Sequence, residues 1–269
     1  MLGLANSLAG GAAPKEFTPE SISNIALWLK VNTNITADEN SGGSGLDPEN
    51  TSNGGNMADG DRVNAWNAAG STSINAVQTT TGDKPRWETD AADLGGVKSA
   101  GGNKYMNLSA DITFDADTDF TIVMRFRPID FGGVRALLGA DDAEFIRLND
   151  ADTIRVKTDS TTSDFDSGTA LATDKYITVI VVRSDGSTGN INIFVRGEDS
   201  GYFDGTAAGT AFGDEVQDTE EIVVSNIMSQ ADDSADFKGI VKDVIIYDGT
   251  AVTSGQREQL FDYIEGQDY

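Results

Sequence analysis

Two apolar runs that flank a polar loop form the clearest pattern in the sequence, within residues 176–197. In the first run, residues 176–182, both sets of alternating positions are mostly apolar, which is typical of a strand covered on two faces. In the second run, Ile191, Ile193 and Val195 alternate with positions that are mostly polar. The loop between the runs carries Asp-Gly and Gly-Asn pairs, which favour a β-hairpin. A fully covered strand beside a half-exposed one predicts the middle of a β-sandwich.

Similar runs recur along most of the chain. Residues 120–127, FTIVMRFR, alternate cleanly and predict a half-buried strand. Further strands are predicted at 22–31, 134–139, 145–148, 153–157, 221–224 and 240–247. The alternation predicts eight side chains buried between two antiparallel sheets: Phe120, Ile122, Met124, Phe126, Ile180, Val182, Ile193 and Val195.

The period of the pattern changes at the C-terminal end. In residues 253–265, Leu260, Phe261 and Ile264 fall on one face at helical spacing, and Thr253 or Ser254 is a candidate N-cap. Many short strands with one terminal helix and no alternation of strands and helices predict an all-β sandwich.

The first eighteen residues have a different composition from the rest. Small residues dominate them, and such a segment buries too little apolar area to order itself. We therefore expect a flexible arm at 1–18 and one domain at 19–269. In an extended arm, Leu2, Leu4 and Leu8 lie on the same side, which makes them candidate anchors to a partner chain.

The charge balance is strongly acidic. The chain of 269 residues has 19 basic and 44 acidic residues, a net charge of −25. Such a surface repels nucleic acid and anionic membranes. The sequence contains no cysteine and no histidine, so disulfides and histidine-based catalytic triads are excluded. The N-terminal sequence lacks a basic segment followed by an apolar core, so no signal peptide is expected, and no apolar run approaches the length of a membrane span.

Several segments together resemble a known family. The segments that carry the similarity are ISNIALWLK, RVNAWNAAGST, FTIVMRFRP, VRALLGADDAEFIRLND with TIRVKT, YITVIVVRSDGSTGNINIFVRG and KGIVKDVIIYDGTAVTSGQREQLFDYIE. Over roughly residues 20–265, the chain is similar to laminin-G-like domains. These domains belong to the concanavalin A-like lectin/glucanase superfamily. The resemblance implies a jelly roll of two curved antiparallel sheets with the first and last strands adjacent. That adjacency predicts that 26–29 pairs with 244–247, because an unpaired apolar edge favours aggregation. The chain as a whole also resembles laminin-G-like virion proteins of tailed phages, including marine phages.

Two kinds of binding site follow from the residues and the resemblance. Laminin-G-like domains often hold calcium at a sheet rim with Asp side chains, and Asp141, Asp142, Asp150 and Asp152 bracket a predicted hairpin. A second segment, Asp38-x-Asn40 with Glu49 at the twelfth position, matches a calcium loop only in part, because its eighth position is Gly45 and no helices flank it, so we interpret it as a flexible loop. For a glycan, exposed aromatic rings are candidate stacking platforms: Tyr202, Phe203 and, in another loop, Tyr105.

The catalytic signal is weak. Glycosidases that share this resemblance use the pattern Glu-x-Asp-x-x-Glu, and the nearest match is Glu88-x-Asp90-x-x-Asp93, which departs at its last position. A solvated acidic turn explains this match better than a hydrolytic site does.

Three functions remain in order of preference. The first is a non-enzymatic virion structural protein, a capsid decoration or a tail or fibre component. It would be made in the host cytoplasm, be oligomeric in the particle, and be attached to other virion proteins through its arm. The second is an adhesin that binds host surface glycans, and the third is a glycoside hydrolase.

Overall fold

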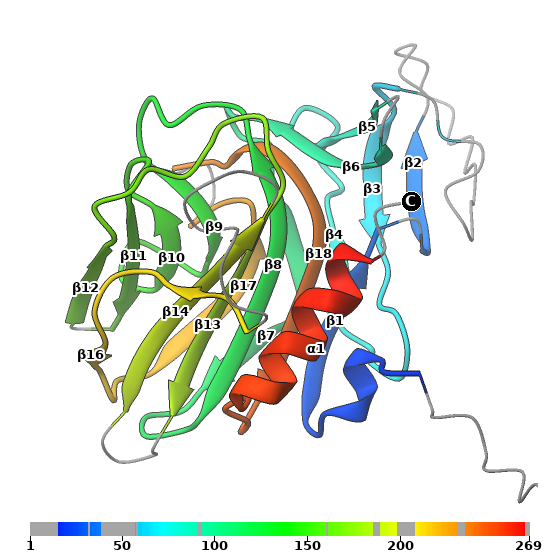
Figure 1. Ribbon diagram of the computed structural model, residues 1–269. Helices are drawn as coiled ribbons and strands as arrows, with labels where there is room; N and C mark the ends of the chain where they lie inside the picture. The colour runs from blue at the N-terminus through cyan, green and yellow to red at the C-terminus, as the bar shows by residue number, and fades with distance from the viewer. Residues whose placement is uncertain are drawn as a thin grey trace, which may run out of the picture.

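The chain folds into two antiparallel β-sheets packed face to face as a jelly-roll sandwich, with one short helix near its C-terminus (Figure 1). The computed structural model describes residues 16–31, 33–38, 57, 59–90, 93–159, 161–184, 189–197, 208–230 and 235–266. The all-β sandwich expected from the alternating pattern is confirmed. None of the helices in the described part of the chain combines the length and the apolar character that crossing a membrane requires.

The first sheet contains the two strands at the ends of the domain. In spatial order its strands are β1 (Ile25–Lys30), β18 (Lys238–Asp248), β8 (Phe120–Pro128), β13 (Ile177–Ser184) and β14 (Asn190–Gly197), with β15 (Thr210–Ala211) and β16 (Val216–Gln217) beside β14. The β13–β14 pair is the expected hairpin.

The strands of the second sheet run in the order β2 (Ile35–Asp38), β3 (Arg62–Trp66), β4 (Ala76–Val77), β7 (Met106–Phe114), β17 (Ile222–Ile227), β9 (Arg135–Gly139), β10 (Phe145–Leu148), β11 (Thr153–Thr158) and β12 (Thr161–Asp166). In Figure 1, β7 and β17 of the second sheet lie behind the first sheet. A hairpin of β5 (Arg86–Asp90) and β6 (Asp93–Ala100) connects the sheets, because β6 pairs with the start of β18 and β5 pairs with β3.

The first and last strands are neighbours, as expected. Ile25 lies opposite Tyr247, and Leu29 lies opposite Val244 in the β1–β18 ladder. This pairing joins the two ends of the domain and covers the apolar edge of β18.

Six of the eight side chains expected between the sheets lie in the main core, but Ile180 and Val182 do not. Both are buried on the opposite face of β13, in a second apolar cluster beneath the helix. The reason is the register with β8, where Val181 lies opposite Ile122 of the main core and Ile180 lies opposite Val123 of the second cluster. The face assigned to these two residues from the sequence is therefore wrong, although their burial is right.

The helix α1 (Ser254–Glu265) covers the outer face of the first sheet (Figure 1). Its N-cap is Thr253, whose side chain accepts a hydrogen bond from the backbone N–H of Gln256, so one of the two candidate caps is confirmed. Leu260, Phe261 and Ile264 are fully buried against the sheet. The helix thus buries the second apolar face that the sheet would otherwise expose to water. A 3-10 turn, η1 (Pro19–Ser21), precedes β1.

Candidate functional site

A pocket of about 510 Å³ opens where three connections between strands meet. The connections are 101–105 between β6 and β7, 129–134 between β8 and β9, and residues 235–237, which lead into β18. They lie together because Lys238 at the start of β18 pairs with Ala100 of β6, while Gly239 pairs with Pro128 of β8. We call this pocket the Asp236 pocket.

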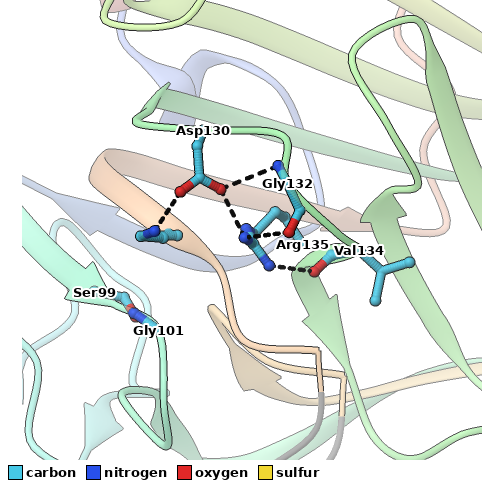
Figure 2. Close-up of polar contacts among 7 residues, drawn as sticks. Ser99, Gly101, Asp130, Gly132, Val134 and Arg135 are labelled. Atoms are coloured by element: carbon cyan, nitrogen blue, oxygen red, sulfur yellow. Dashed lines mark hydrogen bonds and ion pairs between the residues drawn. The ribbon is translucent and has the colours of Figure 1, made fainter.

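Asp130 holds two of these connections together (Figure 2). Its Oδ1 accepts hydrogen bonds from Arg135 Nη2 at 2.6 Å and from the Gly132 backbone N–H at 3.2 Å. Its Oδ2 forms an ion pair with Lys238 Nζ, which ties the 129–134 connection to β18. These hydrogen bonds, first from Lys238 and then from Arg135, lower the pKa of Asp130 to about 2.

The low pKa of Asp130 predicts a stabilising contribution that depends on pH. A carboxyl whose pKa is lower in the folded chain stabilises the fold above its unfolded pKa of 3.8, and that contribution is lost as the pH falls toward 2. We expect Asp130→Asn to be less stable than the parent protein at pH 6, with the difference shrinking between pH 4 and pH 2. Urea denaturation across this interval measures it. A difference that stays constant with pH would contradict this role for Asp130.

The opposite wall of the pocket is an exposed stretch of backbone. Gly101, Gly102 and Asn103 all have positive φ angles, of 75°, 64° and 67°. A Cβ atom added at Gly102 would meet no atom within 4 Å, so the main chain is bare at the mouth of the pocket. The Gly101 backbone N–H donates to Ser99 Oγ at 3.1 Å, which holds the turn against β6 (Figure 2).

Among the described residues that line this pocket, Asp236 is the only one with a carboxylate. Its Oδ2 accepts a hydrogen bond from the Asn103 backbone N–H, and its side chain is only 9% exposed. Its Oδ1 is buried and has no hydrogen-bond partner among the residues that the structure describes. A buried oxygen without a partner costs about 1–3 kcal/mol, so such an atom in a pocket is a ready acceptor for a donor supplied by a ligand.

A second pocket of about 280 Å³ adjoins the first, and Ala100 lines both. We call it the Lys104 pocket. Its charged lining comes from the β5–β6 hairpin, the 59–60 turn and Lys104. Lys98 Nζ forms an ion pair with Glu88 Oε2 at 2.9 Å, and Arg86 Nη1 donates to the Gly60 carbonyl at 2.7 Å.

The four aspartates expected to hold calcium do not converge on one site. Asp141 and Asp142 precede β10, and Asp150 and Asp152 follow it, so the two pairs lie at opposite ends of this strand. Asp141 Oδ1 accepts backbone hydrogen bonds within its own turn, from Ala143 at 2.6 Å and Glu144 at 3.1 Å. A hydrogen bond to Asp150 raises the pKa of Asp152. No group of three or more acidic side chains in the described residues is arranged to hold a metal ion.

Other expected site residues are placed as follows. Tyr105 is 7% exposed and cannot serve as a stacking platform, because its ring is buried. Glu88 is engaged by Lys98, so the carboxylate that begins the glycosidase-like pattern is neutralised by an ion pair.

Four further expectations lie outside the described residues. The structure does not describe the glycan platforms, the arm anchors, most of the 38–49 loop or two side chains of the glycosidase-like pattern. These are Tyr202 and Phe203 for the platforms, Leu2, Leu4 and Leu8 for the anchors, and Asp90 and Asp93 for the pattern. Attachment to a particle through the arm therefore stays a prediction.

Sequence reasoning missed the residues that shape the Asp236 pocket. One signal was available: the Gly-Gly pair at 132–133 lies between the predicted strands 120–127 and 134–139, and a second pair stands at 101–102. Paired glycines beside strand ends mark places where the backbone is bare and another molecule can approach it closely.

A family model described as the concanavalin A-like lectin/glucanases superfamily matches residues 100–256, more than half of the chain. The matched segment includes every residue that lines the Asp236 pocket. No curated protein matches the sequence.

Several solved structures are similar at low identity. Domain 4 of AbnA, a GH43 extracellular arabinanase from Geobacillus stearothermophilus, in complex with arabinotriose, is 12% identical; the match covers 88% of this chain and 98% of that chain, with a TM-score of 0.48. The CBM40 of the Ruminococcus gnavus IT-sialidase, bound to α2,3 sialyllactose, is 11% identical, with coverage of 61% and 95% and a TM-score of 0.41. A SAP-like pentraxin from Limulus polyphemus is 13% identical, with coverage of 54% and 70% and a TM-score of 0.39. No residue role is carried over from these structures.

Proposed function

Because the chain belongs to the concanavalin A-like lectin/glucanases superfamily, we propose that it binds a carbohydrate in the Asp236 pocket without hydrolysing it. The observation that carries this proposal is the buried Oδ1 of Asp236, which has no hydrogen-bond partner among the described residues and lies in a pocket lined by both polar and apolar groups. A sugar hydroxyl is a donor that satisfies such an oxygen, and its own oxygen can accept from a neighbouring side chain.

The size and lining of the pocket support a small polar ligand. A volume of about 510 Å³ lies within the range of small-molecule sites in proteins. Asn103 and Lys238, whose side chains carry hydrogen-bond donors, line the pocket together with Asp236. The bare main chain at Gly101 and Gly102 lets a sugar ring approach the backbone closely.

The carboxylates at the pocket support binding rather than hydrolysis. Glycoside hydrolysis normally needs two carboxyl groups that face one bond, one of them protonated at the working pH. The nearby Asp130 is engaged by Arg135 and Lys238, and its pKa of about 2 keeps it ionised at neutral pH. It therefore cannot act as the general acid beside Asp236.

A glycan array followed by calorimetry tests the proposal. We expect the full-length chain to bind at least one glycan class, and Asp236→Asn to weaken that binding at least tenfold. Asp111→Asn is the matched control, because Asp111 is exposed on β7 and away from the pocket. Asn103→Gly is a second variant, which removes a lining side chain and keeps a residue that tolerates the positive φ angle.

Two results would overturn the proposal. One is an array on which the folded protein binds no glycan. The other is equal affinity for Asp236→Asn, Asn103→Gly and the parent protein. Release of reducing sugars from the bound glycan would refute the non-catalytic part alone.

A further inference from the structure

The two adjoining pockets are rich in cations, unlike the rest of the molecule. Among the described residues that line them, five carry a positive charge and three a negative one. The whole chain has the opposite balance, with 19 basic and 44 acidic residues. At physiological ionic strength charges are screened over about 8 Å, so a ligand in the pockets responds to these neighbouring cations rather than to the distant acidic surface.

Lys104 provides a charge that no described carboxylate pairs with. Lys98 is neutralised by Glu88, while Arg135 and Lys238 share Asp130. Lys104 forms no ion pair in the described part of the chain. Its Nζ instead donates to the backbone carbonyls of Gly82 and, at 3.2 Å, Gly102. An ammonium group has three donors, so one remains for a ligand.

The position of Lys104 links the two pockets. The carbonyl that it contacts belongs to Gly102, which lines the Asp236 pocket, and Ala100 lines both pockets. A saccharide longer than one residue that enters the Asp236 pocket can thus continue across Ala100 toward Lys104.

From this charge and this contiguity, and resting on the proposed function, we infer that the Lys104 pocket is a second subsite that binds an anionic group of the same saccharide chain. The ligand class is then an acidic oligosaccharide, carrying a carboxylate or a sulfate on the residue next to the one in the Asp236 pocket. Lys104 selects for the anionic group by pairing with it directly. Asp236 binds the neighbouring sugar unit, whether or not the saccharide carries that anionic group.

The test compares acidic oligosaccharides with neutral counterparts of the same backbone. Suitable probes are galacturonate oligomers against their methyl esters, and sulfated against desulfated galactan oligomers. We expect the parent protein to bind one acidic member at least tenfold more tightly than its neutral counterpart. Lys104→Gln should remove most of that preference without changing the affinity for the neutral member, whereas Asp236→Asn should weaken both.

Lys157→Gln is the matched control, because Lys157 lies on β11, away from both pockets, and its Nζ also donates to a backbone carbonyl, that of Asp142. Urea denaturation of each variant shows whether it is folded. Equal binding of acidic and neutral members by the parent protein would overturn the second subsite while leaving carbohydrate binding intact. An unchanged preference in Lys104→Gln would do the same.

Two further outcomes are distinguishable. If no member of any pair binds, the proposed function itself fails. Inorganic sulfate or phosphate and the neutral oligosaccharide are each tested as competitors of the acidic oligosaccharide. If the inorganic anion displaces it as strongly as the neutral oligosaccharide does, the subsite is only a free-anion site, and the inference of an acidic saccharide is wrong.

Discussion

Replacing Arg183 by methionine is expected to lower the free energy of unfolding by about 3–5 kcal/mol. Arg183 is fully buried at the end of β13 and donates to three backbone carbonyls: those of Thr118 at 2.7 Å, Asp115 at 2.7 Å and Glu220. Methionine is unbranched like the arginine stem, but it is shorter and has no donor, so all three carbonyls lose a charge-assisted hydrogen bond. The guanidinium also lies 4.8 Å from the ring centroid of Phe120, and that contact is lost as well.

Arg155→Met is the matched control for this substitution. Arg155 makes two hydrogen bonds to Asp164, at 2.6 and 2.7 Å, but the pair lies at the surface of β11 and β12. Surface ion pairs contribute only about 0–1 kcal/mol. Urea denaturation of both variants separates the two cases, and an equal loss of stability would show that Arg183 does not organise the loops around it.

Replacing Ile180 by alanine is expected to cost about 2–5 kcal/mol, the range for truncation of a buried aliphatic side chain. Ile180 is fully buried, yet it lies in the cluster beneath α1 rather than between the sheets. The loss should therefore couple to the helix. In the double variant Ile180→Ala with Leu260→Ala, we expect the loss in free energy of unfolding to differ measurably from the sum of the losses in the two single variants. The two effects should be coupled because both side chains belong to that cluster.

Ile193→Ala is the comparison for this pair, because Ile193 belongs to the main core. Its effect should add to that of Leu260→Ala within the error of denaturation experiments. If Ile180 and Leu260 were additive and Ile193 and Leu260 were coupled, the position of the helix over β13 would be wrong.

The parts of the fold that were predictable from the sequence are those in which one face of an element is apolar. The helical spacing of Leu260, Phe261 and Ile264 identifies one buried face, and the structure buries it. The alternation in 120–127 identifies the face of β8 that lies in the main core, but the prediction of a half-buried strand is wrong, because Thr121, Val123 and Arg125 on the other face are buried as well. The face of β13 was not predictable in this way. Both of its faces are apolar, so only the register with β8 decides which one lies between the sheets.

The candidate site was hidden from the sequence for another reason. Lys104, Asp130 and Asp236 are far apart in the chain, and no fixed spacing connects them. They come together only because β18 pairs with both β6 and β8, a long-range arrangement that local patterns do not encode. The aspartates that do cluster in the sequence mainly cap their own turns or bond to near neighbours.

The pairing of β1 with β18 also determines how the domain responds to mechanical tension. Ile25 lies opposite Tyr247, and the Asp248 N–H donates to the Asn24 carbonyl, so the chain enters and leaves this ladder at the same end. A force that pulls these ends apart loads one hydrogen bond at a time, like opening a zipper, rather than shearing the whole ladder at once. The ring of Tyr263 on α1 contacts Phe17 and Trp28, so the helix resists the pull before the first of these bonds is loaded.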